Sequence, residues 1–445
     1  MMKTPICDFI EEYKKSNKVR FHMPGHKGVK LLGPEANDIT EIDGADYLYL
    51  SKGIIAKSEE NASKLFGFHT FYSTEGSSQC IRAMLFLALT NRSDKINRPY
   101  VLATRNAHKT FITAAALMDF DVEWLYKEAS TYHSCNITDI DVEEALSNKA
   151  NKPFAVYLTS PDYLGNILPI EKIAKVCKKY NVPLLVDNAH GAYLKFITPS
   201  IHPIDLGADM CCDSAHKTLP SLTGAAYLHI ANSTNDYYVD HAKEALGLFG
   251  STSPSYLILQ SLDKTNLYIA NNLASFNDSI KEINELKESL KAFGYNIIGN
   301  EKMKITIDAK AFGYTGNEIA DYLALNNVIS EFSDNDFIVL MPSIKNTKEE
   351  LGILRELLLK IKRKNLIPYL DFHIDNKKPI MSIREATFAE RETICIDDAE
   401  GRILADTSVS CPPAIPIVVS GEAIDDNDIK LFKYYGIEKI SVVKK

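Results

Sequence analysis

The sequence lacks the features that mark membrane, secreted and metal-ribbon proteins. No apolar run reaches the ~20 residues of a membrane-spanning helix. Acidic residues follow the N-terminus too early for a signal peptide. The eight cysteines include no pair in CxxC spacing, which excludes the usual zinc-ribbon and dithiol redox motifs. Internal repeats and low-complexity segments are also missing. We therefore expect a globular cytoplasmic protein without membrane contact, structural disulfides or a metal site.

Basic residues are fewer than acidic residues. The 445 residues carry 50 Lys and Arg against 58 Asp and Glu, which gives a net charge of −8. A nucleic-acid-binding surface needs clustered basic residues, so we expect no nucleic-acid partner. The length, with 45% hydrophobic residues, is ample for a large core and for two or more domains.

What is present is a regular alternation of apolar runs and helical patterns. We expect strands at 100–103, 122–126, 154–159, immediately before 187 and before 213, and at 224–230, 296–298, 304–307, 337–340 and 415–419. We expect helices at 10–15, 77–90, 107–118, 140–149, 170–180, 255–290, 316–326 and 347–363. This alternation predicts an α/β fold with a mainly parallel sheet covered on both faces. Ligands of such sheets bind at the carboxyl ends of the strands.

The same pattern suggests how the chain divides. We expect an N-terminal arm over residues 1–70, which is polar and broken by turn residues, and a large α/β domain over 71–275. A smaller α/β domain over 276–370 and a C-terminal segment over 371–445 complete the expected organisation.

Lys217 and Asp187 carry the strongest chemical signal. Lys217 follows one apolar run, with Ser214 and His216 beside it, and Asp187 ends another apolar run thirty positions upstream. A surface lysine after a strand and an aspartate that caps a helix are the alternatives. Taken together, the two residues suit pyridoxal phosphate (PLP). A lysine forms an imine with its aldehyde, and a carboxylate keeps its pyridine nitrogen protonated.

Three further segments contain candidate binding residues. Ser77 and Ser78 begin an expected helix, where free N–H groups and the helix dipole favour a phosphate, although the same residues cap ordinary helices. His108 begins another helix after a strand and can stack on a pyridine ring; a cap or a packed side chain is the alternative. His190 lies near the cofactor if Asp187 does.

Together these segments resemble the Orn/Lys/Arg decarboxylases, a PLP-dependent group with the aspartate-aminotransferase (fold type I) fold. The resemblance covers nearly the whole chain. It rests on residues 21–28 (similar to F-H-x-P-G-H-K-x-G), 38–46 (D-x-T-E-x-x-G-x-D), 105–109 (R-N-x-H-K), 187–191 (D-x-A-H-G), 214–217 (S-x-H-K), 252–256 (T-S-P-S-Y), 384–386, 401–403 and 412–416.

The resemblance implies a role for each candidate residue. His108 would stack on the cofactor and Asp187 would bind its ring nitrogen, with Ala189 and His190 against the ring or the imine. Ser214 and His216 would lie by the phosphate, and Lys217 would be the imine lysine. Thr252 belongs to a segment thought to reach the cofactor across a dimer interface, so the resemblance implies a homodimer or a larger homo-oligomer.

The implied activity is decarboxylation of a basic L-amino acid to its amine and CO2, a reaction of polyamine biosynthesis. Arginine or lysine is favoured over ornithine only because short family members commonly use them. Lys217 or His216 would return a proton to Cα, and Glu41, Asp43, Asp46 or an acid of the C-terminal segment would bind the substrate side chain. An aminotransferase, which would release an α-keto acid, and a catalytically weak regulatory or binding homologue are the alternatives.

Four positions depart from the family pattern. Glu75 replaces an asparagine in the phosphate loop, and a carboxylate there repels a phosphate unless it points away. Asp162 stands where the family has Thr or Asn, Cys411 where it has Tyr, and Ala414 where it has Gly. These changes bear on substrate identity and catalytic rate more than on the cofactor site.

Overall fold

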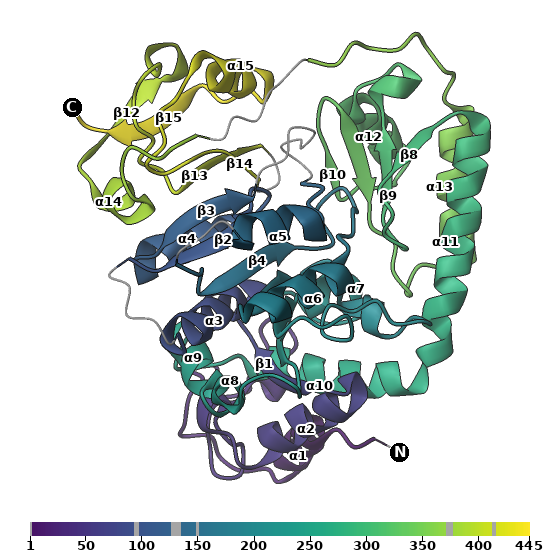
Figure 1. Ribbon diagram of the computed structural model, residues 1–445. Helices are drawn as coiled ribbons and strands as arrows, with labels where there is room; N and C mark the ends of the chain where they lie inside the picture. The colour runs from purple at the N-terminus through teal and green to yellow at the C-terminus, as the bar shows by residue number, and fades with distance from the viewer. Residues whose placement is uncertain (1, 93–97, 126–134, 148–150, 371–376, 412–414) are drawn as a thin grey trace. The chain divides into compact units, whose positions relative to one another are not determined.

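The computed structural model describes residues 2–92, 98–125, 135–147, 151–370, 377–411 and 415–445 (Figure 1). The chain forms two compact units. The first comprises Met1–Lys95 and Cys177–Phe276, and the second comprises Ile96–Val176 and Asn277–Lys445. Among the described residues, no helix has the length and apolar character needed to cross a membrane.

The first unit contains four neighbouring strands in the order β1-β7-β6-β5. Their bounds are His69–Ser73 (β1), Ala226–Ile230 (β7), Met210–Asp213 (β6) and Leu184–Asp187 (β5). β5 and β6 are parallel, whereas β7 is antiparallel to both of its neighbours. Every residue of β5, β6 and β7 is buried, as expected of apolar strands covered on both faces.

Helices account for most of the rest of the first unit. They are α1 (Pro5–Lys15), α2 (Ile54–Phe66), α3 (Gly76–Thr90), α7 (Ala215–Thr218), α8 (Asp236–Asp240), α9 (Ala242–Leu248) and α10 (Tyr256–Asn271). Two further helices, α6 (Ile170–Tyr180) and α11 (Leu273–Phe293), each pass from one unit into the other. Helix α3 packs on β6 and β7. Its first turn lies beside the end of β6, because Ser77 and Ser214 share a hydrogen bond of 2.8 Å.

The second unit contains three parallel strands in the order β4-β2-β3, with two helices. The bounds are Ala155–Thr159 (β4), Tyr100–Thr104 (β2), Asp121–Leu125 (β3), Lys109–Met118 (α4) and Asp139–Ser147 (α5). A separate antiparallel sheet follows in the order β10-β11-β9-β8, with helices α12 and α13. These elements are Asn296–Ile298 (β8), Ile305–Asp308 (β9), Phe332–Ser333 (β10), Phe337–Leu340 (β11), Gly316–Leu325 (α12) and Lys348–Lys360 (α13).

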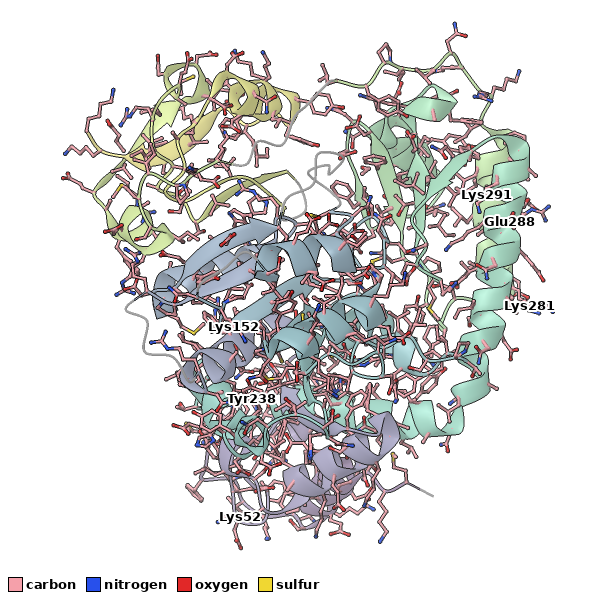
Figure 2. All side chains as sticks on the ribbon, in the orientation of Figure 1. Lys52, Lys152, Tyr238, Lys281, Glu288 and Lys291 are labelled. Atoms are coloured by element: carbon pink, nitrogen blue, oxygen red, sulfur yellow. The ribbon has the colours of Figure 1, made fainter. Side chains whose placement is uncertain are left out.

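Local sequence explains why these helices start where they do. Thr315 begins α12 and Thr347 begins α13, each in a capping box with a glutamate three residues later. Along α11, Glu288 and Lys291, labelled in Figure 2, form an ion pair of 2.8 Å that supports the exposed face of this long helix.

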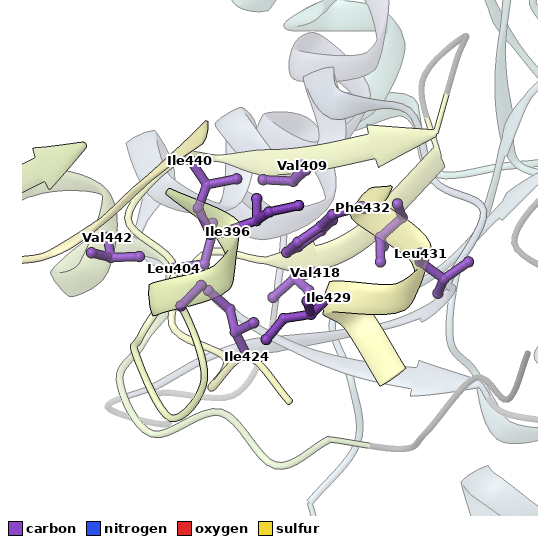
Figure 3. Close-up of a cluster of buried hydrophobic side chains, with 12 residues drawn as sticks. Ile396, Leu404, Val409, Val418, Ile424, Ile429, Leu431, Phe432, Ile440 and Val442 are labelled. Carbon is purple, nitrogen blue, oxygen red and sulfur yellow. The ribbon is translucent and has the colours of Figure 1, made fainter. Parts of the chain in front are cut away.

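The C-terminal part of the second unit has its own small core. Two antiparallel pairs, β12 with β15 and β13 with β14, lie with helices α14 and α15. The bounds are Arg391–Cys395 (β12), Ser408–Cys411 (β13), Ile415–Val419 (β14), Lys439–Val443 (β15), Ile383–Phe388 (α14) and Asp426–Tyr434 (α15). Buried side chains such as Leu404, Val418, Leu431 and Phe432 pack together there (Figure 3).

The structure confirms most of the expected elements and corrects others. Helix α2 and strand β1 lie within or at the end of the segment that we expected to be broken by turns. The predicted helix over 107–118 begins two residues later, because His108 caps it. Tyr126, residues 148–149 and Pro412, Pro413 and Ala414 lie outside the described residues.

Candidate active site

Lys217 lies in a single helical turn directly after β6. All four residues of β6 are buried, and the backbone N–H of Lys217 donates to the carbonyl of Ser214 (3.1 Å). The Lys217 Nζ atom lies 3.1 Å from Nε2 of His190. An ammonium group has only donors, so Nε2 of His190 accepts from a protonated Lys217.

Asp187 ends β5, the parallel neighbour of β6, and pairs in register with Cys212. Its side chain is 3% exposed. The Oδ1 atom accepts hydrogen bonds from the Ala189 N–H (3.2 Å) and the Cys212 thiol (3.5 Å). The carboxyl ends of two adjacent parallel strands therefore bring Asp187, Ala189 and His190 to the turn that carries Lys217.

The start of α3 joins this turn from another direction. The Ser214 hydroxyl donates to the Ser77 hydroxyl (2.8 Å), and Ser78 follows in the first turn of α3. Glu75, the residue before α3, makes no capping hydrogen bond to the helix. It is exposed and accepts a hydrogen bond from the Ser251 N–H (3.3 Å). The side chain that replaces the family's asparagine thus points toward residue 251, while Ser77 remains at the helix N-terminus.

His216 is held by the neighbouring backbone. Its Nδ1 atom donates to the Ala225 carbonyl (2.9 Å), because a carbonyl can only accept. Burial lowers the pKa of His216, and the nearby Lys217 charge adds to this effect.

Thr252 lies in an exposed segment of the first unit. The end of that segment is fixed by Ser255, which caps α10, and by Tyr256, whose hydroxyl donates to the Asp46 carbonyl (2.6 Å).

His108 and Asp162 belong to the second unit. His108 caps α4: its Nδ1 atom accepts from the Thr110 N–H (3.2 Å) and lies 2.9 Å from the Thr110 hydroxyl. The buried Asp162 carboxylate accepts from the backbone and side-chain N–H groups of Asn166, at 2.8 and 2.9 Å. Asp162 therefore stabilises a turn, which gives its departure from the family pattern a structural reason.

A buried ion pair in the second unit has no counterpart among the predicted roles. Arg105 binds Glu422 through two hydrogen bonds, of 2.6 and 2.7 Å, and its guanidinium lies 5.0 Å from the centre of the Trp124 ring. Arg105 was recognised only as part of a motif. No local pattern pairs it with an acid 317 positions later in the chain.

Models of two domains from one protein family match most of the chain. Residues 4–304 match the Orn/Lys/Arg decarboxylase major domain, and residues 369–440 match the C-terminal domain of the same family. The chain belongs to the Orn/Lys/Arg decarboxylase family. The resemblance predicted from the sequence is thereby confirmed.

Individual members of the Orn/Lys/Arg decarboxylase family agree with this assignment. An arginine decarboxylase from Bacillus anthracis is 28% identical over 97% of this chain and 92% of its own length. One from Bacillus subtilis is 27% identical, over 97% and 93%.

Among solved structures, the Francisella novicida lysine decarboxylase LdcF matches with a TM-score of 0.81 at 16% identity, over 100% of this chain and 81% of that one. The E. coli constitutive lysine decarboxylase matches with a TM-score of 0.78 at 18% identity, over 99% and 82%. These likenesses confirm the predicted fold class, an α/β fold of PLP type I.

The residues of the first unit fit the cofactor of the Orn/Lys/Arg decarboxylases. Buried hydroxyl oxygens of Thr74 and Thr218 make no hydrogen bond to any described residue. Thr74 lies two residues before α3, and Thr218 lies next to Lys217. Hydroxyl groups and the N-terminus of a helix are donors that suit a phosphate, so Ser77, Ser214 and the Thr74 hydroxyl before α3 fit that group.

Proposed function

We propose that the protein is a PLP-dependent decarboxylase that converts a basic L-amino acid into the corresponding amine and CO2. The observation that carries this proposal is the placement of Asp187 and Lys217 after two adjacent parallel strands in a chain of the Orn/Lys/Arg decarboxylase family. When bound, PLP would supply an electron-accepting ring that delocalises the electron pair left on Cα when CO2 departs.

The first unit would hold the cofactor by complementary contacts. Lys217 provides the amine for the aldehyde, and the Asp187 carboxylate provides the negative charge for the ring nitrogen. The remaining residues proposed to contact the cofactor are Ala189 and His190 at the ring, Ser77, Ser78, Ser214 and His216 at the phosphate, and His108 and Thr252 by family resemblance.

We assign the return of a proton to Cα to Lys217 in preference to His216. The Nδ1–H of His216 is donated to the Ala225 carbonyl, and burial lowers the pKa of this ring, which disfavours a second N–H. A general acid needs a proton within reach of the reacting atom. The Lys217 ammonium carries three, and its hydrogen bond to His190 holds the amine in place.

Glu41 is our candidate for binding the basic side chain of the substrate. Asp46 is already engaged, since it accepts hydrogen bonds from the backbone N–H groups of Tyr47, Lys52, Gly53, Ile55 and Ala56. Asp43 is exposed. The Glu41 Oε1 atom, in contrast, is buried and accepts no hydrogen bond from any described residue. A guanidinium or ammonium group would satisfy it.

Arginine is the first candidate substrate and lysine the second, because arginine decarboxylases are among the relatives that match over most of their length. We expect ornithine to be the poorest of the three. We also propose that two copies of the chain assemble, in the cytoplasm. Large apolar side chains of the N-terminal segment, such as Phe21 and Leu32 (93% and 92% exposed), would be covered by a second copy.

The test is product identification by mass spectrometry. Purified, PLP-loaded protein is incubated separately with arginine, lysine and ornithine, with the Lys217→Ala variant as the control. We expect agmatine or cadaverine from the native protein and none from the variant. An α-keto acid product would indicate an aminotransferase. No product from any of the three would refute the proposed reaction and favour a regulatory or binding role.

A further inference from the structure

A fully buried hydrogen-bond network lies at the base of the turn that carries Lys217. At its centre is Asp213, the last residue of β6, with no exposed surface. Its Oδ1 atom accepts from the Asn188 side-chain amide (2.6 Å). Its Oδ2 atom lies 3.2 Å from Nε2 of His202 and 3.1 Å from Nε2 of His229. Both histidines are also fully buried.

The hydrogen-bond pattern identifies the donors in this network. Nδ1 of His202 accepts from the Ile204 N–H (3.3 Å), so its Nε2 carries the hydrogen toward Asp213. Nδ1 of His229 lies 3.0 Å from the Thr70 hydroxyl oxygen, and that hydroxyl also donates to the Phe68 carbonyl (3.2 Å). A carboxylate oxygen can only accept, so Nε2 of His229 donates its hydrogen to Asp213.

Asp213 is the acceptor for all three donors. Burial alone would raise the pKa of this carboxyl group, but the two imidazoles and their hydrogen bonds lower it below its usual range. The network therefore contains an ionised carboxylate without direct access to water. Such a group is strongly destabilising unless its hydrogen bonds are complete.

Asn188 connects this carboxylate to the other turn of the candidate active site. It lies between Asp187 and Ala189, and its backbone N–H donates to the Cys212 carbonyl (3.0 Å). Its side chain reaches Asp213, which directly precedes Ser214. The hydrogen bond between Asn188 and Asp213 thus connects the two turns at their base. The hydrogen bond between His190 and Lys217 connects them near the reacting amine.

We propose that Asp213 and Asn188 are positioning residues that lock the turn carrying Asp187 to the turn carrying Lys217. His202 and His229 hold the Asp213 carboxylate in place, and Asn188 transmits that position to Asp187 and His190. The separation between the Lys217 amine and the Asp187 carboxylate is then set before the cofactor binds, so less ordering accompanies binding. This inference rests on the proposed cofactor and is independent of the substrate.

A metal ion is the competing interpretation of the same side chains. Donor atoms of His202, Cys211 and Asp213 lie within 4.8 Å of one another. However, Nε2 of His202 carries a hydrogen and has no lone pair for a metal. Burial also raises the pKa of Cys211 well above its usual range, which disfavours the thiolate that metals bind. The hydrogen-bonded network is therefore the better account.

The test compares Asn188→Ala with Asp263→Asn, a matched control in the same unit. Asp263 is equally buried and accepts from the Ile6 and Cys7 N–H groups and from the Ser58 hydroxyl, but its hydrogen bonds fix α1 and α2. For Asn188→Ala we expect faster hydrogen exchange at residues 187–191 and 214–218 of the cofactor-free protein. We also expect a Kd for PLP that rises about tenfold, the factor for one hydrogen bond to a charged group. Asp263→Asn should lower the thermal midpoint but change neither readout.

Exchanging the two side chains tests whether Asn188 and Asp213 act as a pair. Asn188→Asp alone places two carboxylates at hydrogen-bond distance and should weaken PLP binding more than Asn188→Ala. Combining Asn188→Asp with Asp213→Asn restores one carboxylate and one amide, so the Kd should return to within about threefold of the native value.

Two results would overturn the proposal. The first is a lower thermal midpoint for Asn188→Ala with unchanged exchange and Kd, which would indicate a purely structural role. The second is one equivalent of zinc per chain in metal analysis of the native protein, lost in His202→Ala. A failure to form amine would refute the proposed reaction but would leave the exchange and PLP-binding predictions standing.

Discussion

At the scale of single residues, Asp187 has the environment that most clearly suits one chemical task. It is 3% exposed, and its Oδ1 atom accepts hydrogen bonds from the Ala189 N–H and the Cys212 thiol. A buried carboxylate of this kind binds a cation favourably, because little water competes for it. A protonated pyridine nitrogen is such a cation.

We therefore expect Asp187→Asn to lower kcat at least ~100-fold, the usual loss when one electrostatic contact to a reacting group is removed. The amide keeps the shape of the side chain and can still accept from Ala189. Steady-state kinetics with the preferred substrate would measure the effect. Asp205→Asn, which removes the partner of Lys195 (2.8 Å) in the same unit, is the control and should leave kcat nearly unchanged. A kcat for Asp187→Asn within threefold of the native value would contradict the assignment.

The sequence predicted single residues well where one local pattern contained the information. Asp187 and Lys217 each follow a continuous apolar run, so their place at strand ends could be predicted. The roles of Asp213, His202 and His229 could not. Cys211 pairs with His229 across two antiparallel strands, and this register, which no sequence spacing shows, places His229 on the same face as Asp213.

At the scale of elements, the N-terminus of α3 is the proposed phosphate site. Ser77 and Ser214 come from different elements and share a hydrogen bond of 2.8 Å. Because they act as one donor pair, replacing either by alanine should raise the Kd for PLP about tenfold. Replacing both should raise the Kd by less than the product of the two single increases.

Equilibrium binding of PLP to Ser77→Ala, Ser214→Ala and the double variant would measure this coupling. Glu75→Asn, which restores the family's residue, is the informative control. Since Glu75 is exposed and accepts from the Ser251 N–H, we expect it to change the Kd less than threefold. Strictly multiplicative effects of the two serine substitutions would contradict a shared site.

Among the elements, strands and helices with strong patterns were predicted and the arrangement of others was not. The buried strands β4, β5 and β11 are nearly continuous apolar runs and were predicted within one residue. Helix α2 was missed, because polar residues dominate its sequence. That Ile55, Ala62 and Phe66 are buried becomes evident only in the folded helix. The antiparallel course of β1 and β7 depends on pairing between residues more than 150 positions apart.

At the scale of the whole molecule, one ion pair joins the C-terminal segment to the turn that carries His108. Arg105 and Glu422 are 8% and 2% exposed, and both hydrogen bonds between them are short. We expect Arg105→Ala to lower the free energy of unfolding by ~3–5 kcal/mol, because the change leaves a buried carboxylate without its cation.

Urea denaturation would measure this loss. Arg98→Ala is the matched control: Arg98 and Asp121 form an exposed ion pair of 3.0 Å in the same unit, and such pairs contribute ~0–1 kcal/mol. Equal, small effects of the two substitutions would show that the buried pair does not anchor the C-terminal segment. The expected domain boundaries at residues 70, 275 and 370 stay a prediction. The family models and the two compact units divide the chain at other positions, and these also differ from one another.

The central claim is that Lys217 holds PLP, and covalent trapping tests it most directly. The PLP-loaded protein is reduced with borohydride and digested, and the peptides are analysed by mass spectrometry. The account predicts one phosphopyridoxyl group per chain, on the peptide that contains Lys217, and no label in Lys217→Ala. A label on another lysine, or none on the native protein, would contradict it.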